Sequence, residues 1–301
     1  MATTSFASYR PSGRLGPLTL ALFAAAIVAA AAAAWLYQML MTWIPYIYVN
    51  LVLCAGFGAG LGVAGAFAVR RGHCRNRIVA VALALPLAAA GIGASYYWAY
   101  RATLSAVAEQ NPEASLDAIR EEVTFDRWID ARKDAGWTMS SSHSTESRKS
   151  SPDISGAGVL VVWAIEALVL LGLTVLLVDA EAQKPYCERC GRWCVPKPLS
   201  LAGLGRADVE HAVQLGDLMP LVDIAMRADG DPARAIVLTG NICEGCAETA
   251  FLTVEEKTTT QKKKQTSVKS VRLIKHAILT SEQRAAFVQR YNFAVGQKLA
   301  A

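Results

Sequence analysis

Five cysteines between residues 187 and 246 could bind a metal ion or exchange disulfides. Cys187 and Cys190 form one C-x-x-C pair, and Cys243 and Cys246 form a second. Two such pairs supply four thiolates, the donor set of a structural tetrahedral Zn²⁺ site with metal–sulfur distances of about 2.3 Å. We expect these four to hold one structural zinc ion, although the gap between the pairs is longer than in the tightest zinc patterns. Cys194 is a fifth thiol that could replace one of them.

The residues around the cysteine pairs favour a small β-sheet. Apolar, β-prone residues flank the second pair in "AIVLTGNICEGCAETAFLTVEE", as a hairpin that carries a metal at its turn requires. Residues 266–280 alternate imperfectly and predict a third strand. The segment between the pairs predicts a helical insertion with Asp208 near its start, and Thr280 or Ser281 would cap a final helix. Residues 179–301 therefore resemble a zinc ribbon, a small α+β domain whose folding depends on the metal.

The compartment of these cysteines decides between metal binding and disulfide chemistry, because stable disulfides form outside reducing compartments. The chain is 53% hydrophobic and has four long apolar stretches, at residues 17–40, 47–69, 78–100 and 157–178. Each can cross a hydrocarbon core of about 30 Å, which needs about 20 helical residues. The first stretch is longer than the core of a secretory signal, so we expect an uncleaved anchor. Three transmembrane helices within 17–100 and a fourth at 157–178 make this a mainly α integral membrane protein.

The arginines near the apolar stretches predict the orientation. Residues 70–77, "RRGHCRNR", contain four arginines and no acid, and Arg10 and Arg14 lie in the short segment 1–16. Positively charged short loops stay in the cytoplasm. Four crossings then leave both termini and the cysteine domain, 179–301, in the cytoplasm. The alanine-rich apolar stretches favour a bacterial cytoplasmic membrane.

Residues 101–156 are then the long extracytoplasmic segment. Leu116, Ile119 and Val123 follow helical spacing, with Asn111 as a candidate cap, so we expect one amphipathic helix that folds back on the other helices or on the membrane surface. The Ser-rich stretch that follows Trp137 predicts a linker.

One carboxylate interrupts the fourth apolar stretch. Glu166 lies near the middle of the bilayer, where an ionised carboxylate costs several kcal/mol unless it meets a polar partner. It could join helices through a hydrogen bond, or it could form a ligand or proton site. The other apolar stretches offer few polar groups beyond Thr19, Asn50 and Ser95, and no basic residue within them could pair with it.

Glycines in the second apolar stretch favour close helix packing. Gly60, Gly62 and Gly65 match the pattern of a dinucleotide-binding loop, but that motif acts between a strand and a helix and not inside a membrane span. Gly56 with Gly60, and Gly58 with Gly62, instead form small-xxx-small pairs. We expect them to pack within the chain, with a homo-oligomer as the alternative.

Taken together, these features predict a non-enzymatic multi-pass membrane protein whose zinc-ribbon domain binds or positions a protein partner in the cytoplasm. Acidic residues nearly balance the lysines of that domain, which argues against a nucleic-acid surface. Four spans and paired cysteines also resemble quinone-linked disulfide-generating membrane enzymes, but the reactive pairs of those enzymes lie in outer loops. A thiol-disulfide oxidoreductase is therefore one alternative function. A transporter or proton-coupled protein that uses Glu166 is another.

Overall fold

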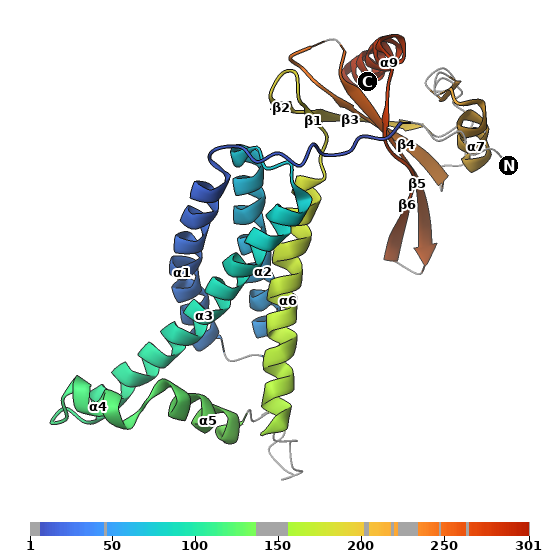
Figure 1. Ribbon diagram of the computed structural model, residues 1–301. Coiled ribbons are helices and arrows are strands. Elements are labelled where there is room, and N and C mark those ends of the chain that lie inside the picture. The colour runs from blue at the N-terminus through green and yellow to red at the C-terminus, as the bar shows by residue number, and fades with distance from the viewer. Residues whose placement is uncertain are drawn as a thin grey trace. The chain divides into compact units, whose positions relative to one another are not determined.

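The computed structural model describes residues 7–44, 47–136, 156–201, 205–217, 220–221, 234–246, 248–262 and 265–300 (Figure 1). The chain divides into two compact units. Gly13–Gln183 form the first, which we call the helical unit. Lys184–Ala301 and the N-terminal Met1–Ser12 form the second, which we call the sheet unit.

The helical unit contains four helices long and apolar enough to cross a membrane, and these are α1 (Thr19–Trp43), α2 (Ile47–Gly72), α3 (Arg77–Gln110) and α6 (Ala157–Ala182). The prediction of four long apolar helices is confirmed, and it indicates a membrane protein. α3 has 34 residues and is about 51 Å long, so it continues past the apolar stretch. Its last turns, from Arg101 onward, carry charged residues.

Glycines bring α2 close to α6. A Cβ atom added at Gly58 would lie 2.9 Å from the Cα of Leu170, and one added at Gly62 would lie 2.7 Å from the Cδ1 of Leu177. Added Cβ atoms at Gly56 and Gly60 would meet nothing within 4 Å. The predicted packing within the chain is therefore confirmed for the Gly58–Gly62 pair, whereas Gly56 and Gly60 make no such contact.

The arginine loop and the start of α1 lie at the same end of the bundle. The Thr19 hydroxyl donates a hydrogen bond of 2.8 Å to the carbonyl oxygen of Gly72. The Asn76 side chain caps α3 by accepting from the N–H of Val79, and Arg77 forms an ion pair with Asp179 near the end of α6. The N-terminal segment and the arginine loop, both predicted to be cytoplasmic, thus share one end of the helical unit.

The segment after α3 differs from the predicted single helix. It forms α4 (Leu116–Glu122) and α5 (Phe125–Ala135). Asn111 was wrong as an N-cap, because it ends α3 and its backbone N–H donates to the carbonyl oxygen of Val107. Ser115 and Thr124 are the actual caps, each accepting from a backbone N–H three residues later. Most of the Ser-rich linker, residues 137–155, lies outside the described residues.

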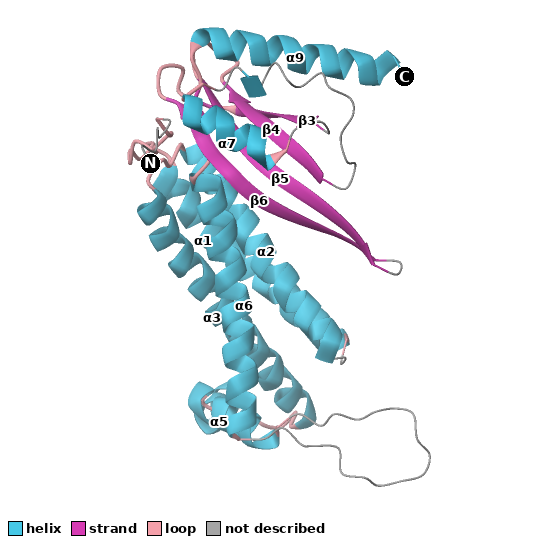
Figure 2. Ribbon diagram, turned by 90° about the vertical axis from the view of Figure 1, so that its right-hand side faces the viewer, coloured by secondary structure: helices cyan, strands magenta, loops and turns pink. Residues whose placement is uncertain are grey.

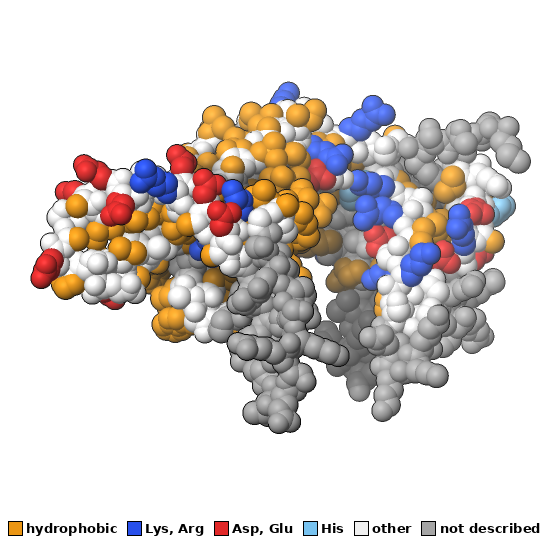
Figure 3. Space-filling view, turned by 90° about the horizontal axis from the view of Figure 1, so that it is seen from below, with side chains coloured by type: hydrophobic (Ala, Val, Ile, Leu, Met, Phe, Trp, Pro, Cys, Tyr) orange, Lys and Arg blue, Asp and Glu red, His pale blue; other side chains and the backbone are white. Residues whose placement is uncertain are grey.

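Aromatic side chains hold α5 against the extended part of α3. The Trp128 indole donates a hydrogen bond of 3.0 Å to the hydroxyl of Thr103, and its ring contacts those of Tyr100 and Phe125. Acidic and basic side chains gather on the outer surface of α4 and α5 (Figure 3). α5 therefore packs its aromatic side chains against α3, α4 buries Ile119, and both helices present their charges outward.

The sheet unit is built on a four-stranded antiparallel sheet (Figure 2). Its strands, in spatial order, are β3 (Val195–Leu201), β4 (Arg234–Ile242), β5 (Ala250–Lys262) and β6 (Gln265–Ile278). A small hairpin of β1 (Tyr186–Cys187) and β2 (Arg192–Trp193) precedes it. The predicted α+β domain is confirmed, including the strand at 266–280 and the helical insertion. The insertion contains α7 (Arg206–Leu215), near whose start the Asp208 carboxylate accepts from the N–H of Gly205.

The core of the sheet unit lies between the sheet and the helices. Leu238 and Leu252 from the sheet, Val209 from α7 and Phe287 from α9 (Ser281–Ala300) are all fully buried in one apolar cluster. Thr280 caps α9, as predicted, by exchanging hydrogen bonds with Gln283. The Phe287 ring lies directly on Gly240, where a Cβ atom would overlap it.

The first described residues of the chain belong to the sheet unit. Ser8 forms a β-bridge with Ala277 of β6, and the N–H of Tyr9 donates 2.9 Å to the carbonyl oxygen of His276. The Tyr9 ring packs 4.9 Å from that of Phe251. Residues 7–9 therefore lie beside β6 in the sheet unit.

Candidate metal centre

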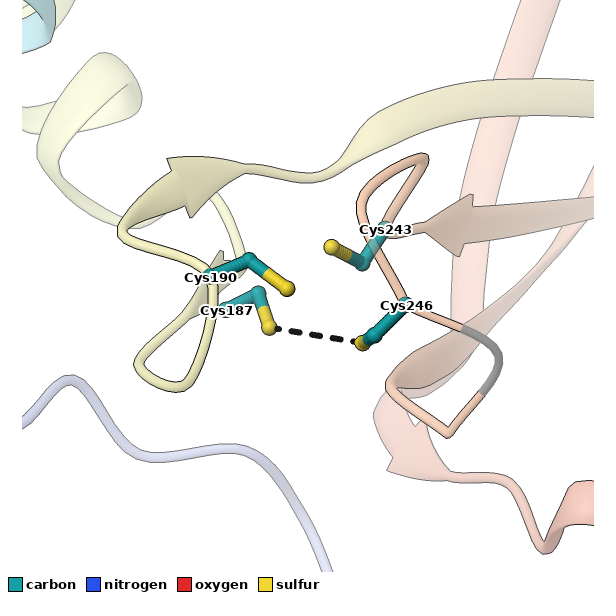
Figure 4. Close-up of side chains that lie close together, drawn as sticks. All are labelled: Cys187, Cys190, Cys243 and Cys246. Atoms are coloured by element: carbon teal, nitrogen blue, oxygen red, sulfur yellow. Dashed lines mark hydrogen bonds between the residues drawn. The ribbon is translucent and has the colours of Figure 1, made fainter.

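The first cysteine pair lies in the β1–β2 hairpin. Cys187 ends β1, and the N–H of Gly191 donates 2.9 Å to the carbonyl oxygen of Cys187. Gly191 has φ +64°, a conformation that glycine adopts without steric cost, so the chain turns sharply just after Cys190. The turn brings both sulfur atoms to the same side of the hairpin (Figure 4).

The second pair lies in the turn between β4 and β5, where the sequence predicted a metal-bearing hairpin. The N–H of Cys243 donates 3.1 Å to the carbonyl oxygen of Thr249, which closes the turn. The N–H of Gly245 points at the Cys243 sulfur, 3.4 Å away. A Cβ atom at Gly245 would lie 3.2 Å from the sulfur of Cys190, so the absence of a side chain lets the two turns approach.

The two turns together place four sulfur atoms within 4.8 Å of one another (Figure 4). The sulfur atoms of Cys187 and Cys246, from different turns, are 3.8 Å apart. In a tetrahedron of thiolates at about 2.3 Å from zinc, the sulfur–sulfur edges are about 3.8 Å. None of the four is in a disulfide. The chemistry and the spacing of these donors therefore fit a metal ion with four thiolate ligands.

The electrostatic surroundings differ among the four thiols. Hydrogen bonds from the Thr249 hydroxyl and from the backbone N–H groups of Glu248 and Thr249 lower the pKa of Cys246 to about 6. Burial and hydrogen bonds with the other thiols raise the pKa of Cys190 to about 12. Crowded thiols therefore resist ionising together unless a cation offsets their charge, and a bound metal ion does this.

Groups outside the cluster join the two turns to each other and to the rest of the sheet unit. Arg189 of the first turn forms an ion pair with Glu248 of the second. The Arg284 guanidinium, from α9, donates 3.2 Å to the carbonyl oxygen of Cys246. Tyr9 and Phe251 pack on the buried side of the cluster. No local sequence pattern pointed to Tyr9 or Arg284, because both reach the cluster only through the tertiary fold.

Cys194 lies outside the group of four. It is buried against Cys187, Cys243 and Phe251, and its sulfur does not join the four mutually close sulfur atoms. Burial, with the neighbouring thiols, raises the pKa of Cys194 to about 12. The structure thus places Cys194 as an apolar neighbour of the cluster.

The remaining singled-out residue, Glu166, belongs to the helical unit. It lies on α6 and lines a cavity together with Asn50 and Ser95. Both belong to the few polar groups singled out in the apolar stretches; Thr19, which was singled out with them, bonds to Gly72 instead.

No protein-family model matches this chain, and comparisons with curated proteins and with solved structures also give no match.

Proposed function

We propose that this chain is a multi-pass membrane protein that holds one structural zinc ion in its sheet unit and uses that unit to bind or position a protein partner in the cytoplasm. The main support for this proposal is the close group of four sulfur atoms from Cys187, Cys190, Cys243 and Cys246. Zinc is the metal that four cysteines from two C-x-x-C turns most often bind.

The role proposed for the metal is structural. Four thiolates complete a tetrahedral shell, so no open position is left for a water molecule or a substrate. The ion would join the β1–β2 hairpin to the β4–β5 turn, two parts of the sheet unit that other contacts also connect. Arg189 and Glu248 form one of these contacts, and an exposed ion pair is worth no more than about 1 kcal/mol.

The geometry favours metal binding over disulfide exchange. An oxidoreductase of the C-x-x-C type works through the two thiols of one motif, with one of them accessible to a partner disulfide. Here the sulfur atoms of both motifs approach one another, and Cys187 and Cys243 are buried. That arrangement suits a shared central ion better than two independent redox pairs.

The cytoplasmic location rests on the arginine-rich loop. Arg70, Arg71, Arg75 and Arg77 lie between α2 and α3, and positive residues in short loops favour the cytoplasmic side. The N-terminal segment pairs with β6, so it must share a compartment with the sheet unit. A reducing compartment keeps the thiols available to a metal ion.

Elemental analysis of the full-length protein, purified in detergent under reducing conditions, tests the proposal. We expect one zinc ion per chain, lost in the Cys246→Ser variant and retained in Cys194→Ser, which removes a neighbouring thiol outside the group. A folded wild-type protein without metal, whose four thiols oxidise reversibly to two disulfides, would instead support the oxidoreductase. Labelling a C-terminal tag on intact and on permeabilised cells tests the orientation separately, and labelling of intact cells would overturn the cytoplasmic assignment.

A further inference from the structure

A cavity of about 750 Å³ lies within the helical unit. Parts of α1, α2, α3, α5 and α6 line it, so it is formed by the fold of this unit alone. Its volume falls in the range of about 300–1,000 Å³ that is usual for small-molecule sites. Glu166 reaches it from α6, nine residues and about 14 Å from the start of that helix.

Two residues that line this cavity, Asn50 and Glu166, carry side-chain acceptors without hydrogen-bond donors. The Asn50 side chain is 8% exposed, and its Oδ1 atom is buried with no hydrogen-bond partner. The Glu166 carboxylate is half-buried, and within the described part of the chain no hydrogen bond or ion pair reaches it. An unpaired buried acceptor costs free energy. A ligand that donates hydrogen bonds to both acceptors would remove that cost.

Aromatic rings line the same cavity. The cavity is lined by Trp35, Tyr37, Tyr96, Trp98 and Trp163. Tyr96 and Trp163 meet edge to face, with ring centroids 5.7 Å apart. The faces of such rings attract cations, and their bodies accept apolar groups. A carboxylate among aromatic rings is therefore complementary to an organic cation with an apolar body.

Two cationic residues, Arg101 and Arg132, also line the cavity, and within the described residues neither forms an ion pair with Glu166. Arg132 of α5 lines the cavity and interacts electrostatically with Glu166, but the two form no ion pair. The Arg132 guanidinium instead lies over the Trp128 ring, 5.3 Å from its centroid. Within the described residues, no group in contact with the Glu166 carboxylate therefore neutralises its charge.

We propose that this cavity binds an amphipathic primary amine. Its ammonium group would donate to the Glu166 carboxylate and to the Oδ1 of Asn50, and its apolar body would lie among the tyrosine and tryptophan rings. Each of the two acceptors would gain a donor, and the ammonium group has three to give. This proposal does not depend on the zinc site, which lies in the other unit.

Three probes that share one ring and differ in charge test the proposal on the full-length protein in detergent. These are 2-phenylethylammonium, 2-phenylethanol and 3-phenylpropanoate, with binding followed by the change in tryptophan fluorescence. We expect saturable binding of the ammonium at least tenfold tighter than that of the alcohol, and none of the carboxylate. The Glu166→Gln variant should lose at least tenfold in affinity for the ammonium and keep its affinity for the alcohol.

Glu109→Gln provides the matched control, because Glu109 is an exposed carboxylate on α3 outside the cavity. It should bind all three probes as the wild type does. If Glu166→Gln fails to fold, Asn50→Ala serves as the second variant, with a smaller but measurable loss for the ammonium alone. Tighter binding of 3-phenylpropanoate, or equal binding of the ammonium by wild type and Glu166→Gln, would overturn the proposal. Zinc content should be the same in every variant, which separates this outcome from the proposed function.

Discussion

The sulfur atoms of Cys187 and Cys246 lie 3.8 Å apart, although 59 positions separate the two residues in the chain. They come from turns of two different hairpins, and the whole helical insertion lies between them. The site therefore exists only when both hairpins are folded and docked. Metal affinity and the stability of the sheet unit should rise and fall together.

Loss of one cysteine ligand should therefore destabilise the whole sheet unit and not the metal site alone. We expect Cys187→Ser to abolish zinc binding and to lower the unfolding temperature of the sheet unit by more than 10 °C, because zinc contributes on the order of 10 kcal/mol to small domains that depend on it. Elemental analysis and circular dichroism of the β signal would measure both effects. Cys54→Ser, in α2, is the control that should leave zinc content unchanged, and zinc retention by Cys187→Ser would contradict the four-ligand site.

His276 should make the sheet unit less stable in mild acid. Its ring is half-buried and its Nδ1 lies 2.9 Å from the Thr253 hydroxyl; burial, then the charges of Lys275 and Arg272, lower its pKa from 6.5 to about 4. Between these two values the unfolded chain binds a proton that the folded chain does not. The free energy of unfolding therefore falls as the pH falls from 6.5 to 4.

The His276→Asn variant isolates this contribution. Residue 276 has φ +52°, which asparagine tolerates better than most residues, so the backbone should be kept. Acid also releases zinc from thiolates, but it does so in both proteins. We expect the unfolding temperature of wild type to fall more steeply than that of the variant from pH 6.5 to pH 4.5, and parallel curves would rule out a role for His276.

Replacing Gly58 or Gly60 of α2 by alanine should have different effects on stability. A Cβ atom at Gly58 would lie 2.9 Å from the backbone of Leu170, so Gly58→Ala must push α2 and α6 apart. Gly60→Ala meets nothing within 4 Å and should gain up to about 1 kcal/mol from helix propensity. Thermal unfolding in detergent should show a drop of several degrees for Gly58→Ala and none for Gly60→Ala. The reverse order would mean that Gly60, rather than Gly58, makes the tight contact.

Substitutions at Gly240 and Phe287, in the sheet unit, should be coupled in their effects on stability. Gly240→Ala overlaps the Phe287 ring and should destabilise the unit by about 1–3 kcal/mol, as overpacked cores usually do. Phe287→Leu makes room at this point, so the double variant should be more stable than the sum of the two single changes implies. Denaturant unfolding of all four proteins measures the coupling, and strict additivity would show that the ring does not rest on Gly240.

Local patterns in the sequence were enough to predict the four long helices, the hairpin with the second cysteine pair and the cap at Thr280. These features depend on apolar length, β-prone flanks and short-range hydrogen bonds. β3 was missed because Pro196 and Pro198 argue against a strand. The sheet accommodates them because β3 is an edge strand, paired on one side only within the described residues, with β4.

Features that depend on distant contacts could not be predicted. The apolar stretches contain no basic residue that could pair with Glu166, and no local pattern predicts that one approaches from outside them. Arg132 reaches the same cavity from α5, which the aromatic contacts of Trp128 hold against α3. Asn111 was misassigned as a cap because α3 continues past its apolar part, and a polar surface gives no sign of where such a helix ends.

The pairing of Ala7–Tyr9 with β6 has a consequence for biosynthesis. Synthesis runs from the N-terminus toward the C-terminus, so residues 7–9 leave the ribosome long before β6. They cannot pair with β6 until it has been synthesised. Until then the outer backbone of β6 and the ring of Phe251 stay uncovered, and the nascent chain is open to chaperones and proteases. Residues 7–9 can therefore dock on the sheet only after β6 has been synthesised.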